Sequence, residues 1–494
     1  MAVRHMAGAT DRVVVVGAGL AGLSAALHLV GAGREVVVCE AEESVGGKAG
    51  VLRDSGYQFD TGPSVLTMPE LIGRAFAAVG ERVEDWLAID RIDPAYRVHY
   101  QDGSFVDVMG DPVAMAEEIE RVCGSSEAGA YHRYRAFLER MYRYEFRDFI
   151  DRNLDGVTSL FTVSLARLVA LGGLRSLEGK VGSFFKDQRM RQLFSFQSLY
   201  AGVSPRQARA LYAVIAYMDV VAGVYFPRGG MHALPEAMAA AAVKHGVRVE
   251  LGEKVVRLET SASGRCRAVV TQDGTRMPAD AVVVTMDPSL ALPTLLGRAS
   301  RPVRLSPSCF LLLTGGRIQA EVHHNIHITR TWAEGFRDII DRGTLMNDPS
   351  FLVSVPSLTD PALAPPGRHC VSVLVPTPNL ATGRLDWERI SGRYHDHVLD
   401  VLRRNGYGEL YESRETEHVL APHHWAQRGC PQGTPFSAAH LLRQTGPFRT
   451  RNLVGDNIVL AGAGTHPGVG IPMALISGRL AAERITGSDV GVDA

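Results

Sequence analysis

Hydrophobic and polar positions fall into blocks along the first forty residues, and these blocks predict a strand, a helix and a second strand. Residues 13–16 are four consecutive valines, which is typical of a strand buried on both faces of a parallel sheet. Glycines then break the run, residues 23–29 have the pattern of a helix, and residues 35–39 form a second apolar strand that ends at Glu40. Together they predict one βαβ unit at the start of the chain.

Similar strand patterns return much later in the chain. They cover residues 246–251, 255–260, 266–272, 279–285 and 457–461, and a helix is predicted over residues 472–485. Residues 110–225 are mainly helical in pattern, with an amphipathic run at 205–217, and residues 300–425 mix helices with strands at 351–355 and 371–375. We therefore expect an α/β fold in which a split Rossmann-like domain carries inserted material.

One segment without charged residues, 13–33, is long enough to suggest a membrane span. Its valines, its glycines, Ser24 and His28 suit a lipid-facing helix poorly, so a buried strand, a turn and a buried helix explain the segment better. Residues 1–12 lack the basic and then apolar pattern of a signal peptide. We expect a protein that does not span a membrane.

Composition and charge narrow the class of protein. Of the 494 residues, 46% are hydrophobic and 21% are charged, so we expect a sizeable core. The formal net charge of −1 argues against nucleic acid as the main partner. The six cysteines form no Cys-x-x-Cys pair, which predicts buried thiols in a reducing compartment and no zinc site. We expect no metal at His323, His324 and His327 either, because neighbours on a strand face opposite sides and no carboxylate accompanies them.

The turn after the first strand has the chemistry of a dinucleotide site. Gly17-x-Gly19-x-x-Gly22 lies between a predicted strand and a predicted helix, so backbone and a helix N-terminus can approach a pyrophosphate. Glu40 can accept hydrogen bonds from a ribose diol and would repel the 2′-phosphate of NADP. The alternative is a glycine-rich turn without a ligand.

Two further segments extend this pattern. Gly46-Gly47-Lys48 offers more backbone and a cation to the same phosphates, although Lys48 could equally be a solvated surface residue. Asp60-Thr61-Gly62-Pro63-Ser64 predicts a tight turn on which a flat ring could pack, or an ordinary Gly-Pro turn.

With these motifs in this order, the chain resembles the FAD-dependent amine-oxidase-like flavoproteins, and within them the bacterial carotenoid desaturases of the phytoene desaturase type. Further segments that resemble this family lie at residues 222–231, 359–365, 373–380 and 462–472, so the likeness runs from about residue 12 to 486. Lys48 stands where many relatives have arginine, and Ser437 where they often have glycine. The resemblance implies FAD, bound at three parts of the chain, 12–105, 226–295 and 446–490. A helical cap that faces a membrane would span 106–225, and a mixed-sheet substrate domain would span 296–445.

The resemblance also implies which residues would contact FAD. The implied positions are Gly17, Ala18, Gly19, Ala21, Gly22, Glu40, Ala41, Gly46, Gly47, Lys48, Gly62, Pro63, Ser64, Val255, Gly464, Gly470, Ile471, Pro472 and Met473. Free N–H groups at the helix start near residue 471 would in addition stabilise negative charge on a reduced flavin.

Candidate catalytic residues are harder to choose, because a hydrocarbon offers no polar handle and its site should be a long apolar tunnel. Asp151, Arg152 and Asp155 lie where the family's proposed catalytic acid and arginine fall, and the alternative is a solvated helix face. His466 is a second candidate base, or a histidine that fixes the turn before the last helix.

The expected partners are a long apolar polyene and the surface of a membrane. Residues 165–171 and Phe184-Phe185 lie among Arg167, Arg175 and Lys180, which suits an interfacial patch, or else these apolar residues are core. The expected location is cytoplasmic and peripheral to the membrane, and the oligomeric state stays open.

We expect FAD-dependent desaturation of phytoene towards lycopene. Alternatives within the family are a desaturase for a C30 precursor, a carotenoid isomerase and a ketolase. Alternatives outside it are an amine oxidase and a lipid-carrying protein that has lost its cofactor.

Overall fold

One half of the molecule is built on a parallel five-stranded sheet whose strands come from segments far apart in the sequence. In this computed structural model, which describes residues 3–487, the strand order is β19-β13-β1-β2-β9. The strands are β1 (Arg12–Val16), β2 (Glu35–Cys39), β9 (Arg248–Glu250), β13 (Ala281–Val284) and β19 (Ile458–Leu460). Val14 pairs with Val37 on one side and with Val282 on the other, as the run of valines predicts.

Alternate residues of β1 face two different layers. Val13 and Val15 pack in the core that contains helix α1 (Leu20–Gly31), while Val14 and Val16 pack against a three-stranded meander. The meander consists of β10 (Val255–Thr260), β11 (Cys266–Thr271) and β12 (Arg276–Pro278).

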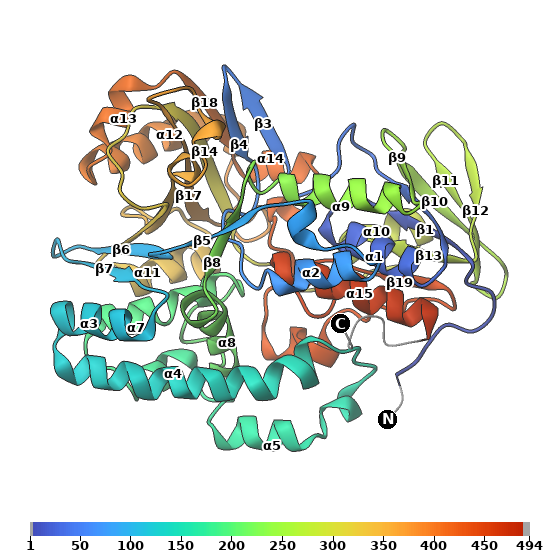
Figure 1. Cartoon of the computed structure of the whole chain (residues 1–494), viewed down its shortest axis with the longest axis horizontal. Coiled ribbons are helices and arrows are strands. Elements are labelled where there is room, and N and C mark those ends of the chain that lie inside the picture. Colours follow the sequence, from blue (N-terminus) through green and yellow to red (C-terminus); the bar gives the residue numbers. More distant parts are fainter. Residues whose placement is uncertain (1–2, 488–494) are drawn as a thin grey trace.

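On the helical face of the sheet, α1 contacts α9 (Ala233–Lys244) and α15 (Ile471–Thr486), and α15 also contacts α2 (Glu70–Ala77). Ser24 of α1 donates its hydroxyl to the Leu475 carbonyl oxygen of α15 at 2.8 Å. In Figure 1 the blue N-terminal helix and the red C-terminal helix accordingly lie side by side. The two ends of the described chain thus build one layer.

A second, seven-stranded sheet forms the other half of the molecule, with the order β18-β14-β17-β16-β15-β6-β7. Only β15 and β6 pair in parallel. The strands are β6 (Tyr96–Tyr100), β7 (Phe105–Val108), β14 (Ser308–Gly316), β15 (His324–Ile328), β16 (Phe351–Ser354), β17 (His369–Thr377) and β18 (Thr416–Leu420). β6 joins this sheet inside the segment 12–105 that was expected to bind FAD, so the chain crosses between the two halves before residue 96.

Helices cover the seven-stranded sheet on one face. The amphipathic helix α12 (Trp387–Arg404) packs Trp387, Tyr394 and Val398 against Phe310 of β14 and Val373 of β17. Helices α13 (Gly408–Ser413) and α14 (Pro422–Gln427) also contact α12. Two further sheets have two antiparallel strands each: β3 (Val51–Asp54) pairs with β4 (Tyr57–Asp60), and β5 (Ile89–Ile92) pairs with the distant β8 (Val224–Pro227).

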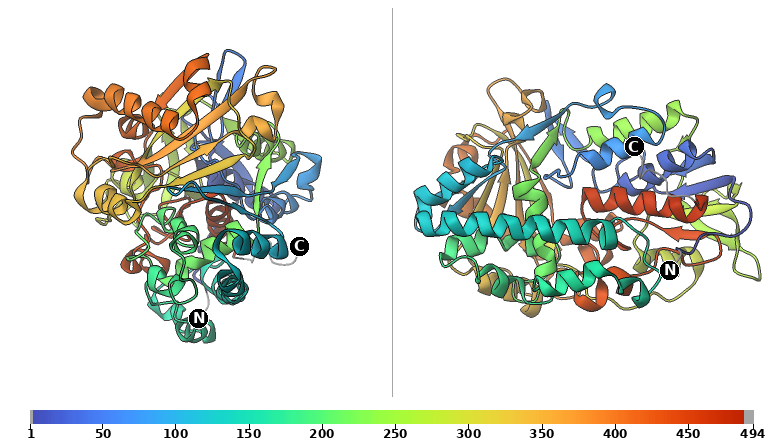
Figure 2. Two further views of the ribbon diagram at one scale, coloured as in Figure 1. Left: turned by 90° about the vertical axis from the view of Figure 1, so that its left-hand side faces the viewer. Right: turned by 60° about the horizontal axis from the view of Figure 1, so that its bottom comes forward.

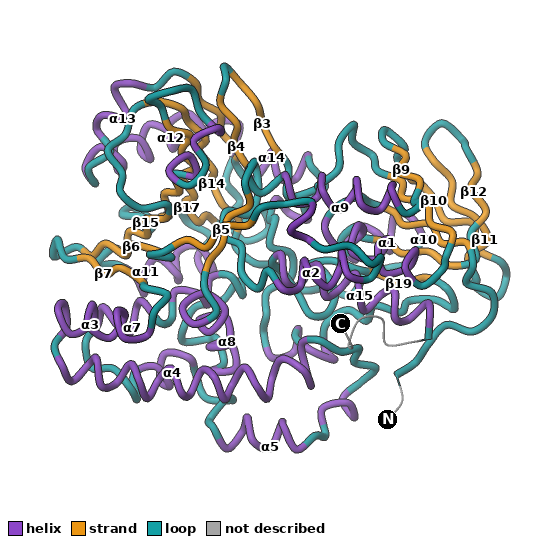
Figure 3. Tube along the Cα trace, viewed as in Figure 1, coloured by secondary structure: helices purple, strands orange, loops and turns teal. Residues whose placement is uncertain are grey.

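The third layer is helical and lies in the lower left and centre of Figure 1, below the seven-stranded sheet, coloured cyan to green. Figure 3 separates it clearly, in purple, from the two groups of orange strands, and Figure 2 shows the long α4 crossing the whole layer. Its helices are α3 (Pro112–Cys123), α4 (Ser125–Glu145), α5 (Val163–Ala170), α6 (Leu177–Val181), α7 (Gln188–Leu193) and α8 (Ala213–Ala216).

The amphipathic run at residues 205–217 was expected to be one helix, and this expectation is wrong. Residues 205–209 are extended or turned, with Arg209 in a bridge to Ser176 and the Ala208 carbonyl accepting from the Leu177 N–H. The chain then forms a short 3₁₀ turn, the four-residue α8 and a π-helical turn, Tyr217–Val221. Tertiary pairing with residues 176–177 therefore replaces the local helix hydrogen bonds.

Among residues 3–487, no helix combines the length and the apolar character that crossing a bilayer requires.

Candidate functional site

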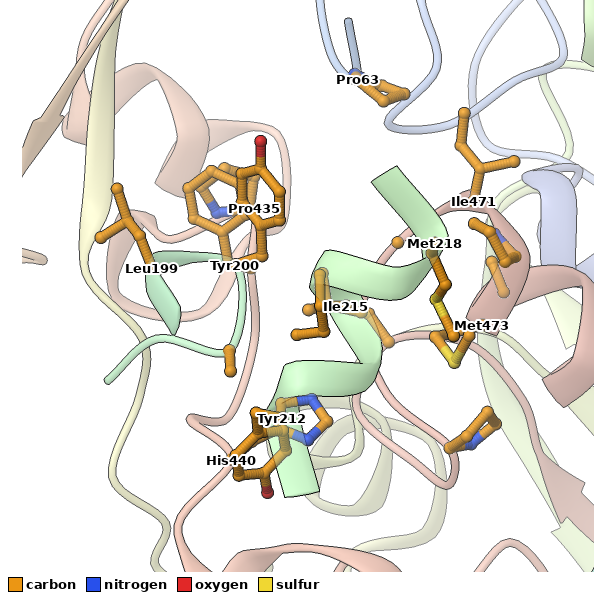
Figure 4. A pocket seen from close by; sticks show the side chains of 18 of the residues that line it. Pro63, Leu199, Tyr200, Tyr212, Ile215, Met218, Pro435, His440, Ile471 and Met473 are labelled. Carbon is orange, nitrogen blue, oxygen red and sulfur yellow. The ribbon is translucent and has the colours of Figure 1, made fainter. Parts of the chain in front are cut away.

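A cavity of about 840 Å³ runs between the two sheets and into the helical layer. Its lining begins at the glycine turn after β1, continues past residues 46–49, 62–65 and 470–474, and ends at Leu165, Val169 and Leu174 of the helical layer. Figure 4 shows its middle part, where Met218 and Ile215 lie between Ile471 on one side and Tyr200 on the other. One continuous space therefore joins a glycine-rich end to an apolar end.

The glycine turn is built to bring backbone close to a ligand. Gly17 adopts φ +104°, and a Cβ on Gly22 would lie 2.0 Å from the Gly17 carbonyl oxygen, so the turn tolerates no side chain there. Helix α1 begins directly behind it at Leu20 without a side-chain cap, which leaves its first N–H groups free for an anion.

Glu40 closes this end of the cavity. Its carboxylate accepts the Ala18 N–H at 2.6 Å and the Glu42 N–H at 3.1 Å, and the side chain is buried. It lines the cavity next to the glycine turn, at the end of β2. This is the position from which a carboxylate can bind a ribose diol.

A second loop, residues 46–49, lies against the first. Gly46 forms a bridge with Gly19, and its N–H donates to the Ala18 carbonyl oxygen at 2.9 Å. Lys48 Nζ donates to the Pro435 carbonyl oxygen at 2.7 Å, and both residues line the cavity. The Lys48 side chain therefore links this loop to a segment far away in the sequence.

Asp60 fixes the end of the segment 222–231, which resembles the family, and the residue that follows it. It accepts the Met231 N–H at 2.9 Å and the His232 N–H at 3.1 Å, directly before α9. Burial raises the pKa of Asp60 to about 6, although these two N–H donors favour its carboxylate. Asp60 is therefore a capping residue, and the following Gly62, Pro63 and Ser64 line the cavity.

The C-terminal glycine-rich segment forms another part of the cavity wall. Arg449 is buried and donates to the carbonyl oxygens of Ala463 at 2.6 Å and Thr465 at 2.8 Å. Burial lowers the pKa of Arg449 to about 10. This guanidinium thus holds the loop that leads to the start of α15.

The residues present fit a dinucleotide cofactor such as FAD. The fit rests on a cradle that a single Cβ would fill at Gly22, on two uncapped helix starts at α1 and α15, and on a buried carboxylate at Glu40. Gly17, Glu40 and the starts of both helices line one cavity, and Gly22 keeps the glycine turn behind this lining tight.

Most of the implied FAD contacts line this cavity, and five do not. Those that line it are Gly17, Gly19, Ala21, Glu40, Gly46, Gly47, Lys48, Gly62, Pro63, Ser64, Gly470, Ile471, Pro472 and Met473. Those that lie outside the lining are Ala18, Gly22, Ala41, Val255 and Gly464.

The reasons for these five differ. Ala18 and Gly22 form the body of the turn behind the lining, Ala41 is exposed, and Val255 packs in the core with the meander. A Cβ on Gly464 would lie 2.1 Å from Pro288 Cδ, so Gly464 is needed for packing, while its neighbours Gly462 and Ala463 line the cavity instead. Thr285, Gly462 and Ala463 line the cavity although they were not among the implied FAD contacts; Gly462 and Ala463 lie in the segment 462–472 that resembles the family.

Ser437 stands where relatives often have glycine, and its backbone explains why. It adopts φ +57°, in the left-handed region that favours glycine, and its hydroxyl donates to the Asp287 carboxylate at 2.5 Å. The serine is thus held by a hydrogen bond that a glycine could not make.

The candidate catalytic residues Asp151, Arg152 and Asp155 lie outside the cavity lining. Asp151 accepts from Arg479 of α15 at 2.7 Å and from Arg74 of α2 at 3.1 Å, and Asp155 accepts from Arg484 at 2.7 Å. These carboxylates therefore tie the loop after α4 to α2 and α15. Arg479 and Arg484 are buried and Arg74 is half-buried, so these two carboxylates hold a loop in place and do not form a solvated helix face.

His466 does line the cavity, as does His440. Burial and the charge of Arg449 lower the pKa of His466 to about 4 and hold the pKa of His440 well below its ordinary value. Both rings are therefore neutral near pH 7.

The histidines at 323, 324 and 327 form hydrogen bonds with Thr359, Ser354 and Tyr407, in that order, at 2.7 to 2.8 Å. Among residues 3–487, no group of three or more histidine, cysteine or acidic side chains could hold a metal ion. All six cysteines are free thiols.

Two buried carboxyl groups that the sequence motifs missed lie in the cavity lining, Asp219 and Glu145. Burial raises the pKa of Asp219 to about 7 and the pKa of Glu145 to about 8. A signal existed for Asp219, because it is the only charged residue between Arg209 and Arg228.

The apolar end of the cavity reaches a surface that also exposes apolar residues. Phe161 is 81% and Val163 is 69% exposed, and Val157, Val169 and Leu174 are exposed as well; we call these five residues the outer patch. Val169 and Leu174 also line the cavity. Phe185, expected in such a patch, is instead fully buried and stacks on Phe194, because the turn before α7 points it inward.

Comparison with known proteins agrees with this site. The family of flavin containing amine oxidoreductases matches residues 20–486. The chain is 52% identical to a phytoene dehydrogenase of Streptomyces griseus over 97% of this chain and 96% of that protein. It is 35% identical to a zeta-carotene-forming phytoene desaturase of Myxococcus xanthus over 96% and 93% of the two chains.

Among solved structures, a putrescine oxidase variant from a study of cofactor binding superimposes with a TM-score of 0.63, at 16% identity, over 97% of this chain and 100% of that chain. This likeness shows a shared amine-oxidase-like fold of mixed α and β elements. The matches together place the chain in the carotenoid desaturase group of the flavin containing amine oxidoreductase family.

Proposed function

We propose that this protein is an FAD-dependent desaturase that introduces double bonds into phytoene towards lycopene. The single observation that carries the proposal is the continuity of the cavity, from the cradle at Gly17 and Glu40 to the apolar residues Leu165, Leu168 and Leu174. A long hydrocarbon can then enter from the apolar end and reach the cofactor end without crossing water.

Bound FAD supplies a two-electron acceptor that can take a hydride from carbon. The chain would hold it with a split Rossmann-like unit formed by β1, β2, β9, β13 and β19, with its pyrophosphate at the start of α1 and its ribose at Glu40. The start of α15, residues 470–473, would face the ring end of the cofactor. There the helix N–H groups favour negative charge.

The rest of the cavity binds and shields the substrate. Its wall includes Leu199, Ile215, Phe351 and Leu374, which contact a hydrocarbon by dispersion and exclude water. His440 and His466 are neutral there, so they do not bring an unpaired positive charge to an apolar ligand.

We further propose that the helical layer faces a membrane and that the protein is cytoplasmic and peripherally bound. The outer patch supports this, because it exposes apolar side chains beside the apolar end of the cavity. Arg167, which lies over the Tyr144 ring, and Lys180, which lies over the Phe137 ring, place basic groups near it for lipid head groups.

The proposed function is tested by incubating the purified, FAD-loaded protein with phytoene in liposomes and separating the products by chromatography. Coloured polyenes with more conjugated double bonds than phytoene are expected. A matched C30 precursor in parallel vesicles separates a C40 enzyme from a C30 desaturase, an isomerase or a ketolase. Bound flavin without any new polyene, or hydrogen peroxide release with amines alone, would contradict the proposal.

A further inference from the structure

Asp219 is a buried carboxyl group inside an otherwise apolar part of the cavity wall. The side chain is 3% exposed and lines the cavity. It lies in the π-helical turn Tyr217–Val221, a wide turn of a kind that often occurs at functional sites. Its neighbours in sequence, Met218 and Val220, are apolar and buried.

Asp219 has no cationic partner in the part of the chain that the structure describes. Within residues 3–487 it forms no ion pair, and no donor reaches Oδ2 with hydrogen-bond geometry, although the Tyr96 hydroxyl lies near enough to favour the carboxylate. The groups that face it are Tyr96 of β6 and Tyr200 of the helical layer. Behind Tyr96 lies the His324 ring of β15, whose centroid is 5.7 Å from the tyrosine ring and which burial keeps neutral by lowering its pKa well below the ordinary value.

An unpaired buried acid destabilises a fold, and proteins keep such groups mainly where chemistry needs them. The same cavity holds a second acid, Glu145, so the two must be distinguished. Asp219 faces Tyr96 and Tyr200, and Figure 4 shows Tyr200 in the middle part of the cavity, across from Ile471 at the start of α15. Tyr212, whose pKa burial raises with a further contribution from the charge of Glu145, lies beside His440 away from α15.

We propose that Asp219 is a catalytic residue whose carboxylate accepts the proton that the substrate loses when each double bond forms. This proposal rests on the proposed desaturase function. One carbon loses a hydride, which oxidised flavin accepts, and the neighbouring carbon loses a proton to a carboxylate oxygen of Asp219. The electron pair of the second C–H bond becomes the new π bond, so two electrons leave the substrate as hydride and the charge balances.

The test compares the FAD-loaded native protein with Asp219→Asn, which keeps the shape and removes the base. In anaerobic single-turnover reactions with phytoene in liposomes, we expect the variant to form polyene about a hundredfold more slowly. Its flavin content and its retention of phytoene should stay native. Glu127→Gln is the matched control, because Glu127 is a buried acid outside the cavity lining, and its rate should stay native.

A second readout does not depend on turnover. In the native holoenzyme, the infrared band of a protonated carboxyl group should disappear with a midpoint near pH 7, since burial raises the pKa of Asp219 to about 7. This step should be missing in Asp219→Asn and present in Glu127→Gln. The single-turnover rate of the native enzyme should rise through the same pH range, because only the carboxylate accepts a proton.

Opposite results would overturn the proposal in distinguishable ways. A rate for Asp219→Asn within twofold of native shows that Asp219 is not the proton acceptor, and a large loss in Glu145→Gln at the same time would give the role to Glu145. If the native enzyme forms no polyene at all, the proposed function fails instead, while the infrared titration still reports whether Asp219 holds a proton. Partial recovery of the rate in Asp219→Glu is expected only if a carboxylate itself is required.

Discussion

The glycine turn at the cofactor end of the cavity can form only because Gly22 has no side chain. Gly22→Ala would place its Cβ 2.0 Å from the Gly17 carbonyl oxygen, so the turn must open and the start of α1 must move. We expect purified Gly22→Ala to carry several-fold less flavin, measured from the ratio of flavin to protein absorbance. Gly392→Ala is the control, because a Cβ there meets no atom within 4 Å, and normal flavin content in both variants would contradict the cradle.

Asp219 also predicts how stability depends on pH. Its folded pKa of about 7 lies above the ordinary 3.8, so its contribution to stability is complete below about pH 4 and is lost as pH rises to about 7. Three pKa units correspond to a loss on the order of 4 kcal/mol. Chemical denaturation at acidic and mildly alkaline pH should show a smaller loss in Asp219→Asn than in the native protein. An equal loss in both would mean that Asp219 ionises normally.

Residue-level sequence analysis succeeded where backbone geometry determines the residue type. Gly17, which has a positive φ, and Glu40, at the end of β2, both line the cavity, as the glycine motif and the acid after the second strand predict. It failed for Asp151 and Asp155, since sequence does not reveal that Arg479 and Arg484, more than three hundred residues later, bind them. It missed Asp219, although this is the only charged residue between Arg209 and Arg228, because the sequence does not show that the side chain lines the cavity.

At the scale of elements, the outer patch around α5 predicts membrane binding. The double variant Phe161→Glu and Val163→Glu places charges on exposed positions outside the cavity lining. We expect its cosedimentation with anionic liposomes to fall several-fold without a change in thermal stability. The control is Val243→Glu, an exposed valine of α9, and equal loss in both variants, or no loss in either, would argue against this surface.

Elements with strong local signals were predicted well. The valine strands β1, β2 and β13 and the terminal helix α15 lie within a few residues of their expected limits, because buried parallel strands and long apolar helices have clear patterns. The run at 205–217 misled the prediction because pairing with residues 176–177 overrides its amphipathic period. Sheet membership of β6 could not be predicted, since it depends on pairing with β15 more than two hundred residues later.

On the scale of the whole molecule, the cofactor cavity joins both ends of the described chain. Gly17 and Glu40 come from its beginning and residues 470–473 from its end, so a bound cofactor would couple these segments. We expect FAD to raise the melting temperature in a concentration-dependent way. At a free FAD concentration a hundredfold above Kd, the free energy of unfolding should increase by about 2.7 kcal/mol. Scanning calorimetry of apo and reconstituted protein measures this, and an unchanged melting temperature at saturating FAD would contradict it.

Anaerobic mixing of the FAD-loaded protein with phytoene in liposomes tests most directly whether one cavity couples the flavin to a hydrocarbon. Flavin absorbance and polyene absorbance are followed together in the same sample. The flavin should bleach as the polyene appears, with one new double bond formed for each flavin reduced. A flavin that stays oxidised in the presence of phytoene, or a polyene that forms without flavin reduction, would contradict the proposed function.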